Sequence, residues 1–193
     1  MKIINKNTIS PSIATALLMW IMMDTQNFKI QTTDKEAFEI SAELMELWAR
    51  RNDIYEKLFN NKKYNDIKFL WLLLSRIKQG KYKDIIYYYT FSNTDEIEKH
   101  WVDIGNSEGY KRDLINTMNT IWDSNFVITL TIDTIENSTK LSFRSKTNFD
   151  VNKLANTINW WWHKWAAWAK LNYAINPENI KKLIENMIRE SQI

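Results

Sequence analysis

Hydrophobic and polar residues follow a helical period in the first part of the chain, up to about residue 80. A capping box, in which a hydroxyl and a carboxylate bond the free amides at a helix start, is indicated by Thr33-Asp34-Lys35-Glu36. We predict a helix from this box to about Leu47. Farther along, apolar residues recur at steps of three and four, which predicts one buried helical face made of Ile67, Leu70, Trp71, Leu74 and Ile77. Residues 33–78 are therefore predicted to be mostly helical.

Beyond residue 80 the pattern favours strands that alternate with helices. Residues 79–81 interrupt the helical period, and residues 85–91 are the β-branched and aromatic types that strands prefer. Residues 114–121 return to a helical period, residues 126–132 alternate as in a half-buried strand, and turn residues at 136–138 predict a hairpin with residues 140–146. Asn176 as N-cap and Pro177 at the first position begin a last helix, whose apolar face holds Ile180, Leu183, Ile184, Met187 and Ile188. The predicted fold class is α/β.

Composition places the chain among globular proteins of a reducing compartment. Its 193 residues are 45% hydrophobic, which is enough to bury a core, and the absence of Cys excludes disulfides and thiolate metal sites. We therefore expect a cytoplasmic protein. The longest apolar run, residues 13–23, is shorter than the roughly 20 residues that span a bilayer, and no small-residue cleavage site follows it, so no membrane partner is expected. The net charge of +3 is mild, so any anion site must be local.

Tryptophan is unusually frequent in this chain and glycine unusually rare. The sequence contains 3 Gly and 10 Trp, whereas the average usage of about 7% would give roughly 13 Gly. The densest group of tryptophans lies in residues 158–171, INWWWHKWAAWAKL, which becomes INGGGHKGAAGAKL when each Trp is read as Gly. Successive glycines let backbone N–H groups converge on a phosphate. Our hypothesis is that a stop codon reassigned to Gly has been translated as Trp; ordinary Trp codons at these positions would exclude it.

Two other interpretations of this segment stay open. Genuine indoles beside basic residues would form a platform for stacking bases, at about 1–3 kcal/mol per base, or the segment would belong to a hydrophobic core. Genuine indoles would also ruin a phosphate site, because bulky side chains disfavour positive φ and fill the ligand's space. Recoded glycine is favoured because Trp168 also falls where the pattern A-A-G requires Gly.

The order of motifs around this loop resembles the C-terminal domain associated with DHH-family phosphoesterases. In that domain a strand ending in L-R-S or F-R-S leads to D-V-N-K-I-A, then to G-G-G-H and A-A-G. The present chain has KLSFRSK at 140–146, FDVNKLANTI at 149–158 and then the Trp-rich loop with His163. Because strand side chains alternate, Arg144 faces away from its apolar neighbours, as an ordinary surface Arg would. The resemblance implies instead a site for the substrate phosphate formed by Arg144, Ser145, His163 and the supposed Gly positions Trp160, Trp161 and Trp162.

The first part of the chain resembles the fourth motif of the same family. Residues 13–28 read IATALLMWIMMDTQNF, where the family has A-T-A-L-x-x-G-I-x-x-D-T-G-x-F. Trp20 stands at the family's Gly, and Gln26 departs from a second one. The Asp of this motif ligates the catalytic metal, so the resemblance assigns that catalytic role to Asp24, directly after an apolar, strand-like run. Trp48 also stands at a family Gly position, where a helix-ending Gly is expected. Trp71 and Trp122 resemble family Gly positions more weakly, and Trp101 is assigned to Gly from composition alone.

The family's first three motifs, including D-H-H itself, do not occur before Asp24. The resemblance thus implies a C-terminal fragment that lacks most of the N-terminal catalytic domain. On this interpretation residues 1–32 end the DHH catalytic domain, residues 33–80 form a helical connector, and residues 81–193 form the DHH-associated substrate-binding domain, a small mixed-sheet α/β unit. A fragment with one metal-ligating Asp is expected to be inactive alone.

Within the family, these motifs are most similar to the oligoribonuclease and phosphoadenosine-phosphate phosphatase type. This implies a Mn²⁺-dependent hydrolase, with two ions in the full-length protein, that acts on short RNA or small phosphorylated nucleotides. A homodimer is a further expected assembly. Alternatives are a relative acting on single-stranded DNA, cyclic dinucleotides or polyphosphate, a non-catalytic nucleic-acid-binding module, and a decayed gene with genuine tryptophans. We assign no chemistry to His100.

Overall fold

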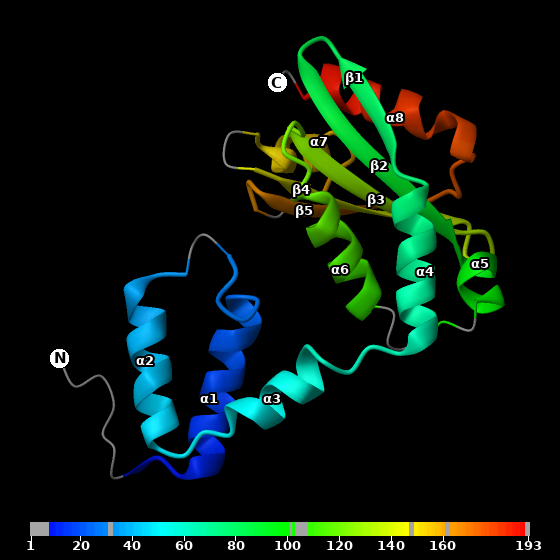
Figure 1. Cartoon of the computed structure of the whole chain (residues 1–193). Coiled ribbons are helices and arrows are strands. Elements are labelled where there is room, and N and C mark those ends of the chain that lie inside the picture. Colours follow the sequence, from blue (N-terminus) through cyan, green and yellow to red (C-terminus); the bar gives the residue numbers. More distant parts are fainter. Residues whose placement is uncertain are drawn as a thin grey trace. The chain divides into compact units, whose positions relative to one another are not determined.

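The computed structural model describes residues 8–30, 33–100, 102, 108–146, 149–160 and 163–191, and it forms two compact units, residues 1–62 and 63–193 (Figure 1). The first unit is helical and the second is built on a sheet, so the predicted α/β class is confirmed. Within the described residues, no helix is both long and apolar enough to cross a bilayer.

The helical unit contains three helices, α1 (Pro11–Asp24), α2 (Lys35–Glu46) and α3 (Arg51–Leu58). Their buried contacts form one small core, made of Ala14, Leu18, Met22, Leu44 and Ile54. The predicted start of α2 is correct to within a residue, but Asp34 is its N-cap rather than Thr33, because the Asp34 carboxylate accepts the Ala37 N–H at 2.8 Å.

The end of α2 is a Schellman motif with Trp48 in the left-handed position. The N–H of Ala49 donates to the carbonyl of Leu44 at 3.1 Å, and the N–H of Trp48 donates to that of Met45 at 3.0 Å. Trp48 has φ of 64°, a conformation that glycine adopts at no steric cost and a bulky L-residue does not. The backbone at Trp48 thus has the geometry expected of a C-cap glycine.

Trp48→Gly is expected to raise the free energy of unfolding by roughly 0.5–1 kcal/mol. The gain is the relief of about 1–2 kcal/mol of left-handed strain, less about 0.4–1 kcal/mol for the greater freedom of the unfolded chain. Trp122→Gly is the matched control, because Trp122 is 89% exposed against 78% for Trp48 but has no positive φ. That control should lose stability. The free energy of unfolding of both variants would be measured by urea unfolding followed by circular dichroism. Equal changes in the two variants would contradict the claim that Trp48 is strained.

Most described tryptophans lie on the surface rather than in a core. Those with 41–89% of their area exposed are Trp20, Trp48, Trp71, Trp122, Trp165 and Trp168. Genuine tryptophans are highly buried on average, so this distribution supports recoded glycine. The predicted buried face of helix α4 (Tyr64–Ser75) is correct in part. Leu70, Leu74 and Ile77 pack against the core, but Ile67 and Trp71 are exposed, and the fully buried residues are Phe69 and Leu73.

The second unit is built on a five-stranded sheet with the strand order β1-β2-β3-β4-β5. The strands are β1 (Lys78–Tyr82), β2 (Ile85–Asn93), β3 (Phe126–Asp133), β4 (Ser138–Ser145) and β5 (Ala166–Leu171). Only β2 and β3 pair in parallel among these strands, so the sheet is mixed, as predicted. The predicted hairpin is β3–β4. Residues 79–81, expected to be a break, lie in β1 instead, where Gly80 leaves room for the buried Tyr87 ring opposite it.

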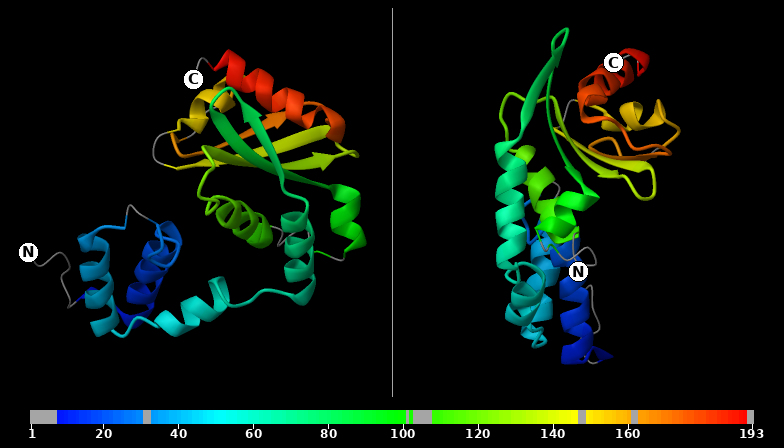
Figure 2. Two further views of the ribbon diagram at one scale, coloured as in Figure 1. Left: turned by 45° about the horizontal axis from the view of Figure 1, so that its top comes forward. Right: turned by 90° about the vertical axis from the view of Figure 1, so that its right-hand side faces the viewer.

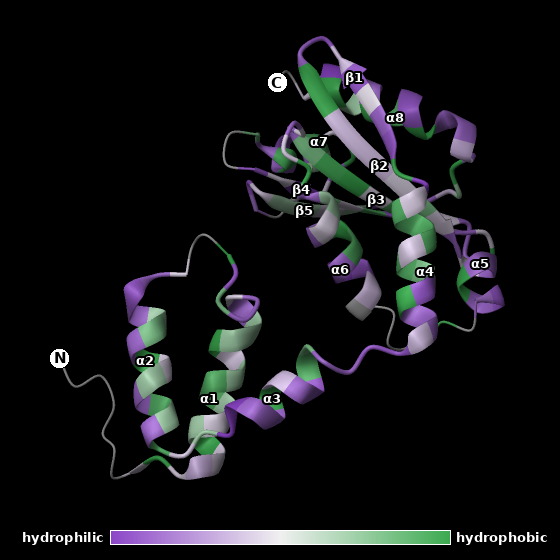
Figure 3. Cartoon of the chain, in the orientation of Figure 1, coloured by the Kyte–Doolittle hydropathy of each residue, from purple (hydrophilic) through white to green (hydrophobic). Residues whose placement is uncertain are grey.

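Helices cover both faces of the sheet (Figure 2). On one face lie α7 (Val151–Asn156), the short 3₁₀ helix Pro177–Asn179 and α8 (Ile180–Glu190); on the other lie α4 (Tyr64–Ser75), α5 (Thr94–Lys99) and α6 (Glu108–Met118). Strand β3 is predominantly hydrophobic (Figure 3) and is buried on both sides, through Ile128 on the α8 face and Val127 on the α6 face. The predicted half-buried strand is therefore wrong on this point, because two helical layers enclose it.

The last helix is confirmed, and so is the helix before the hairpin, although α6 ends at Met118 and leaves the predicted Ile121 outside it. Asn176 accepts the Glu178 N–H and Pro177 follows it, although the first turn is 3₁₀ rather than α-helical. Of the segment predicted as a connector, α2 and α3 belong to the helical unit, while α4 packs with α6 and β2 in the second unit.

Candidate phosphate site

The candidate site is at the carboxyl end of β4, where Arg144 follows the buried Phe143. Leu141 and Phe143 point into the core under α7 and α8, and Arg144 points to the opposite face, as the alternation of strand side chains predicted. Register places Arg144 between Val127 of β3 and Ala166 of β5. The side chain therefore lies on the interior of the sheet face rather than at an edge.

Arg144 is a partly buried cation that no described carboxylate neutralises. Burial lowers the pKa of its guanidinium, and one terminal nitrogen donates to the carbonyl of its own neighbour, Phe143, at 2.9 Å. A guanidinium carries five N–H donors in a fork that matches phosphate geometry. Burying a charge without a counter-ion is costly, so this arrangement is suited to binding an anion.

Ser145 is buried and ties the following loop to the sheet. Its hydroxyl donates to the carbonyl of Phe149 at 2.6 Å, and its N–H donates to the carbonyl of Trp165 at 3.1 Å. Because the hydroxyl proton is engaged by a carbonyl, Ser145 positions the backbone here and has no side-chain proton to offer a phosphate. Its direct phosphate contact, implied by the resemblance, stays a prediction.

His163 and Arg144 lie on opposite sides of Ala166, which pairs with both of them. His163 and Ala166 form an antiparallel bridge, with N–H to carbonyl distances of 3.0 and 3.2 Å, and Ala166 is also the register partner of Arg144. The side chain of His163 is exposed. The structure thus brings Arg144, Ser145 and His163 to one end of the β4–β5 ribbon, although they are separated in the sequence.

The loop that precedes His163 begins with a second Schellman motif. Asn159 has φ of 60°, and the Trp160 N–H donates to the carbonyl of Ala155 at 3.1 Å. The Trp160 indole turns onto β5, where its N–H donates to the carbonyl of Lys170 at 3.2 Å and its ring lies 4.3 Å from that of Trp168. The neighbouring predicted positions Trp161 and Trp162 lie outside the described residues.

Asp24 belongs to the other unit and ends a helix rather than a strand. The run before it was expected to be strand-like, but it forms α1. The Ser10 side chain caps the first turn, Pro11 begins the helix, and Ala, Leu and Met, which favour helices, are frequent in it. The chain then turns sharply: Gln26 has φ of 48°, and the Thr25 hydroxyl accepts the Phe28 N–H at 3.0 Å. Gln26 therefore takes the backbone conformation that the family's Gly would favour.

Asp24 is exposed and is the predicted metal ligand. A carboxylate is a ligand that Mn²⁺ accepts, but one carboxylate does not make a metal site. In the described part of the chain there is no group of three or more His, Asp or Glu side chains that could hold an ion. The metal assignment of Asp24 stays a prediction.

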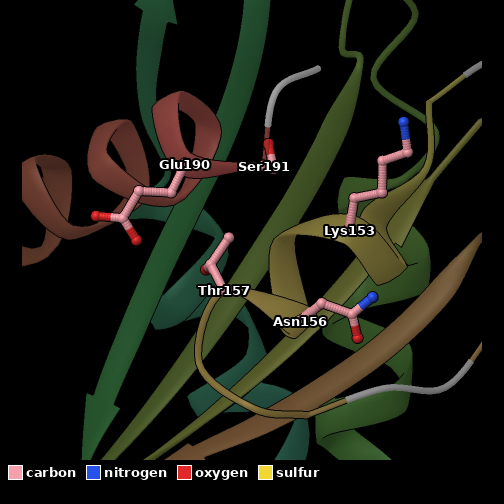
Figure 4. A pocket seen from close by; sticks show the side chains of 5 residues that line it. All are labelled: Lys153, Asn156, Thr157, Glu190 and Ser191. Atoms are coloured by element: carbon pink, nitrogen blue, oxygen red, sulfur yellow. The ribbon is translucent and has the colours of Figure 1, made fainter.

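A shallow pocket of about 460 Å³ lies between α7 and α8, which cover the sheet face opposite Arg144 (Figure 4). Its lining residues are Lys153, Asn156, Thr157, Glu190 and Ser191. Figure 4 shows the Lys153 and Glu190 side chains pointing away from each other, so no charge of one sign collects there. No sequence pattern predicted this pocket, and its mixed lining indicates no particular ligand.

Comparison with known proteins gives matches among solved structures, whereas no family model and no curated protein matches the chain. An exopolyphosphatase-related protein from Bacteroides fragilis is 26% identical with a TM-score of 0.79, over 97% of this chain and 54% of that one. The pGpG-specific phosphodiesterase PggH from Vibrio cholerae matches at 10% identity and a TM-score of 0.43, over 97% and 63%. RecJ from Thermus thermophilus, in complex with Mn²⁺, matches at 13% identity and a TM-score of 0.35, over 94% of this chain and 23% of that one. The chain thus spans about half the length of the first of these structures.

Proposed function

We propose a function from the premise that this chain is related to the DHH-family phosphoesterases and corresponds to their C-terminal part. The protein to which it belongs would be a Mn²⁺-dependent phosphoesterase that hydrolyses short oligoribonucleotides or small phosphorylated nucleotides. This chain would supply the site that binds the substrate phosphate. The observation that carries the proposal is the partly buried Arg144, whose charge no described carboxylate balances.

Each residue of the site would have a separate task. Arg144 would hold the phosphate oxygens through its forked N–H groups, while His163 lies alongside and Ser145 fixes the loop between them. In the reaction a water oxygen bonds to phosphorus, the ester bond breaks, and the leaving oxygen takes a proton. Mn²⁺, when bound, would activate that water and stabilise the charge on phosphorus. Asp24 would be one ligand, and the remaining ligands would come from family motifs that these 193 residues do not contain.

Hydrolysis of polyphosphate is the second candidate. It is favoured by the similarity of this chain to the exopolyphosphatase-related protein from Bacteroides fragilis. Arg144 alone does not distinguish nucleotide hydrolysis from polyphosphate hydrolysis, because both substrates offer a terminal phosphate to a guanidinium.

A substrate panel tests the proposal. The protein would contain this chain, with glycine at its tryptophan positions, joined to upstream sequence that carries the D-H-H motif. We expect Mn²⁺-dependent release of mononucleotides from RNA of three to five nucleotides, and slower release of phosphate from polyphosphate. Polyphosphate hydrolysis that is faster than RNA hydrolysis would establish the second candidate. Binding of RNA without any hydrolysis would instead favour a non-catalytic nucleic-acid-binding module.

A further inference from the structure

The β4–β5 ribbon presents a second set of cations on the face that carries Arg144. We call this the outer ribbon face and define it by the side chains that point away from α7 and α8: Lys140, Ser142, Arg144, Ala166, Trp168 and Lys170. The intervening residues of both strands point into the α7–α8 core. Arg144 therefore lies at one end of a row of side chains on this face, beside the part of the face that α6 covers.

Strand register arranges these side chains in three rows. Arg144 pairs with Ala166, Ser142 with Trp168, and Lys140 with Lys170. On β3 the row of Arg144 ends at Val127, which is buried under α6, while the other two rows continue with the half-buried Thr129 and Thr131. No row contains an acidic residue, and the two rows beyond Arg144 offer hydroxyls and ammonium groups.

The lysines of the outer ribbon face are accessible to a ligand. Lys140 is exposed, and 35% of the Lys170 side-chain area is exposed. Lys170 lies 3.7 Å from Glu136, whose side chain is 65% exposed. Such exposed pairs contribute about 0–1 kcal/mol, so a phosphate can displace Glu136 at little cost. Trp168 is 41% exposed in the middle row, and a glycine there would leave the cationic rows unchanged.

The spacing of the rows suits a chain of phosphates. Rows on one strand lie two residues apart, about 6.6–6.8 Å, so Lys140 is about 13 Å along the strand from Arg144. A single nucleotide held at Arg144 does not extend that far, whereas a short polynucleotide does. The hydroxyls of Thr129 and Ser142, between the cations, match the sugar groups that separate phosphates in RNA.

We propose that the outer ribbon face binds the sugar-phosphate backbone of the nucleotides that follow the one held by Arg144. This inference rests on the proposed function and deepens it, because it makes an oligonucleotide of several residues the substrate in preference to a small bisphosphorylated nucleotide. Lys140 and Lys170 are then determinants of substrate length.

Binding of RNA of two lengths tests this inference. The chain would carry glycine at Trp160, Trp161 and Trp162 in every sample, and binding of labelled two- and five-nucleotide RNA would be measured. We expect the double variant Lys140→Gln, Lys170→Gln to weaken five-nucleotide binding about fivefold to tenfold and to leave two-nucleotide binding within twofold. The slope of log affinity against log salt should also fall by about 1.4, at about 0.7 for each phosphate contact of a single strand.

The matched control removes two cations from the opposite layer. Lys182 and Arg189 are exposed on α8, which covers the other face of the sheet, so Lys182→Gln, Arg189→Gln should change neither affinity. Circular dichroism would verify that both double variants are folded. Equal loss for the two RNA lengths, or no loss for either, would overturn the inference.

Failure of the inference is distinguishable from failure of the proposed function. If Arg144→Gln removes binding of both RNAs while the two lysine substitutions affect neither, the phosphate site stands and the outer ribbon face is rejected. If neither RNA binds the parent chain, both are rejected. A five-unit polyphosphate that binds as tightly as the RNA, with the same dependence on Lys140 and Lys170, would reject the assignment to nucleotides.

Discussion

Arg144→Gln is expected to weaken binding of a phosphate-terminated short RNA by roughly tenfold to a hundredfold. Hydrogen bonds that involve a charged group contribute about 1.5–3 kcal/mol, and glutamine keeps much of the arginine's bulk without the charge or the fork. The affinity would be measured by fluorescence anisotropy on the 193-residue chain with glycine at Trp160, Trp161 and Trp162. Arg189→Gln, an equal loss of charge on α8, is the control and should bind like the parent.

The stability of the same variant separates a binding role from a structural one. Burial lowers the pKa of Arg144, which means that the folded environment disfavours its charged form, and no described carboxylate repays that cost. Replacing it with neutral glutamine should therefore leave the free energy of unfolding unchanged or raise it. An arginine that served the fold would behave oppositely. A variant that lost stability and RNA affinity together would contradict the phosphate site.

The sequence could predict the elements whose residues repeat with a clear period. The β3–β4 hairpin and α8 were predicted nearly to the residue, because alternation and three- and four-residue steps are properties of short segments. Helix α1 was mistaken for a strand because its residues are apolar all round, so no period distinguishes the two. The predicted buried face of α4 was wrong at Trp71, which was counted as a core residue but is 71% exposed.

The candidate site was predictable only through resemblance. Nothing in local composition relates Arg144 to His163. They come to the same end of the ribbon because β4 and β5 pair in a register that places Ala166 between them. The outer ribbon face depends on the same register, since Lys140 and Lys170 share a row only when the strands pair this way. Pairing between distant segments is not readable from the hydrophobic pattern of either strand alone.

The Trp-for-Gly hypothesis gains support from backbone geometry that no codon argument used. Trp48 lies in the left-handed position of a Schellman motif, where a family glycine was expected from the sequence. Gln26 adopts the same conformation at a second family Gly position although it is not a tryptophan. The backbone thus follows the family's glycine pattern at both positions, whichever residue occupies them.

Asp24→Ala is expected to reduce the Mn²⁺-dependent hydrolysis of short RNA by about a thousandfold or more. The assay would use the protein that combines this chain with the upstream D-H-H motif, and kcat would be measured at saturating Mn²⁺. Loss of a metal ligand removes several kcal/mol of charge stabilisation, and about 4.1 kcal/mol corresponds to a thousandfold in rate.

The fold gives Asp24 no stabilising task, and this makes the substitution informative. The Asp24 side chain makes no hydrogen bond or ion pair with any described residue, and it ends α1, where the helix dipole disfavours a carboxylate by about 0.3–1 kcal/mol. Asp24→Ala should therefore unfold no more easily than the parent while losing its activity. Asp84→Ala, at an exposed position in the β1–β2 turn, is the control and should keep full activity. If hydrolysis persisted without Asp24, the metal would have to be held elsewhere, and the resemblance of residues 13–28 to the fourth motif would carry no catalytic meaning.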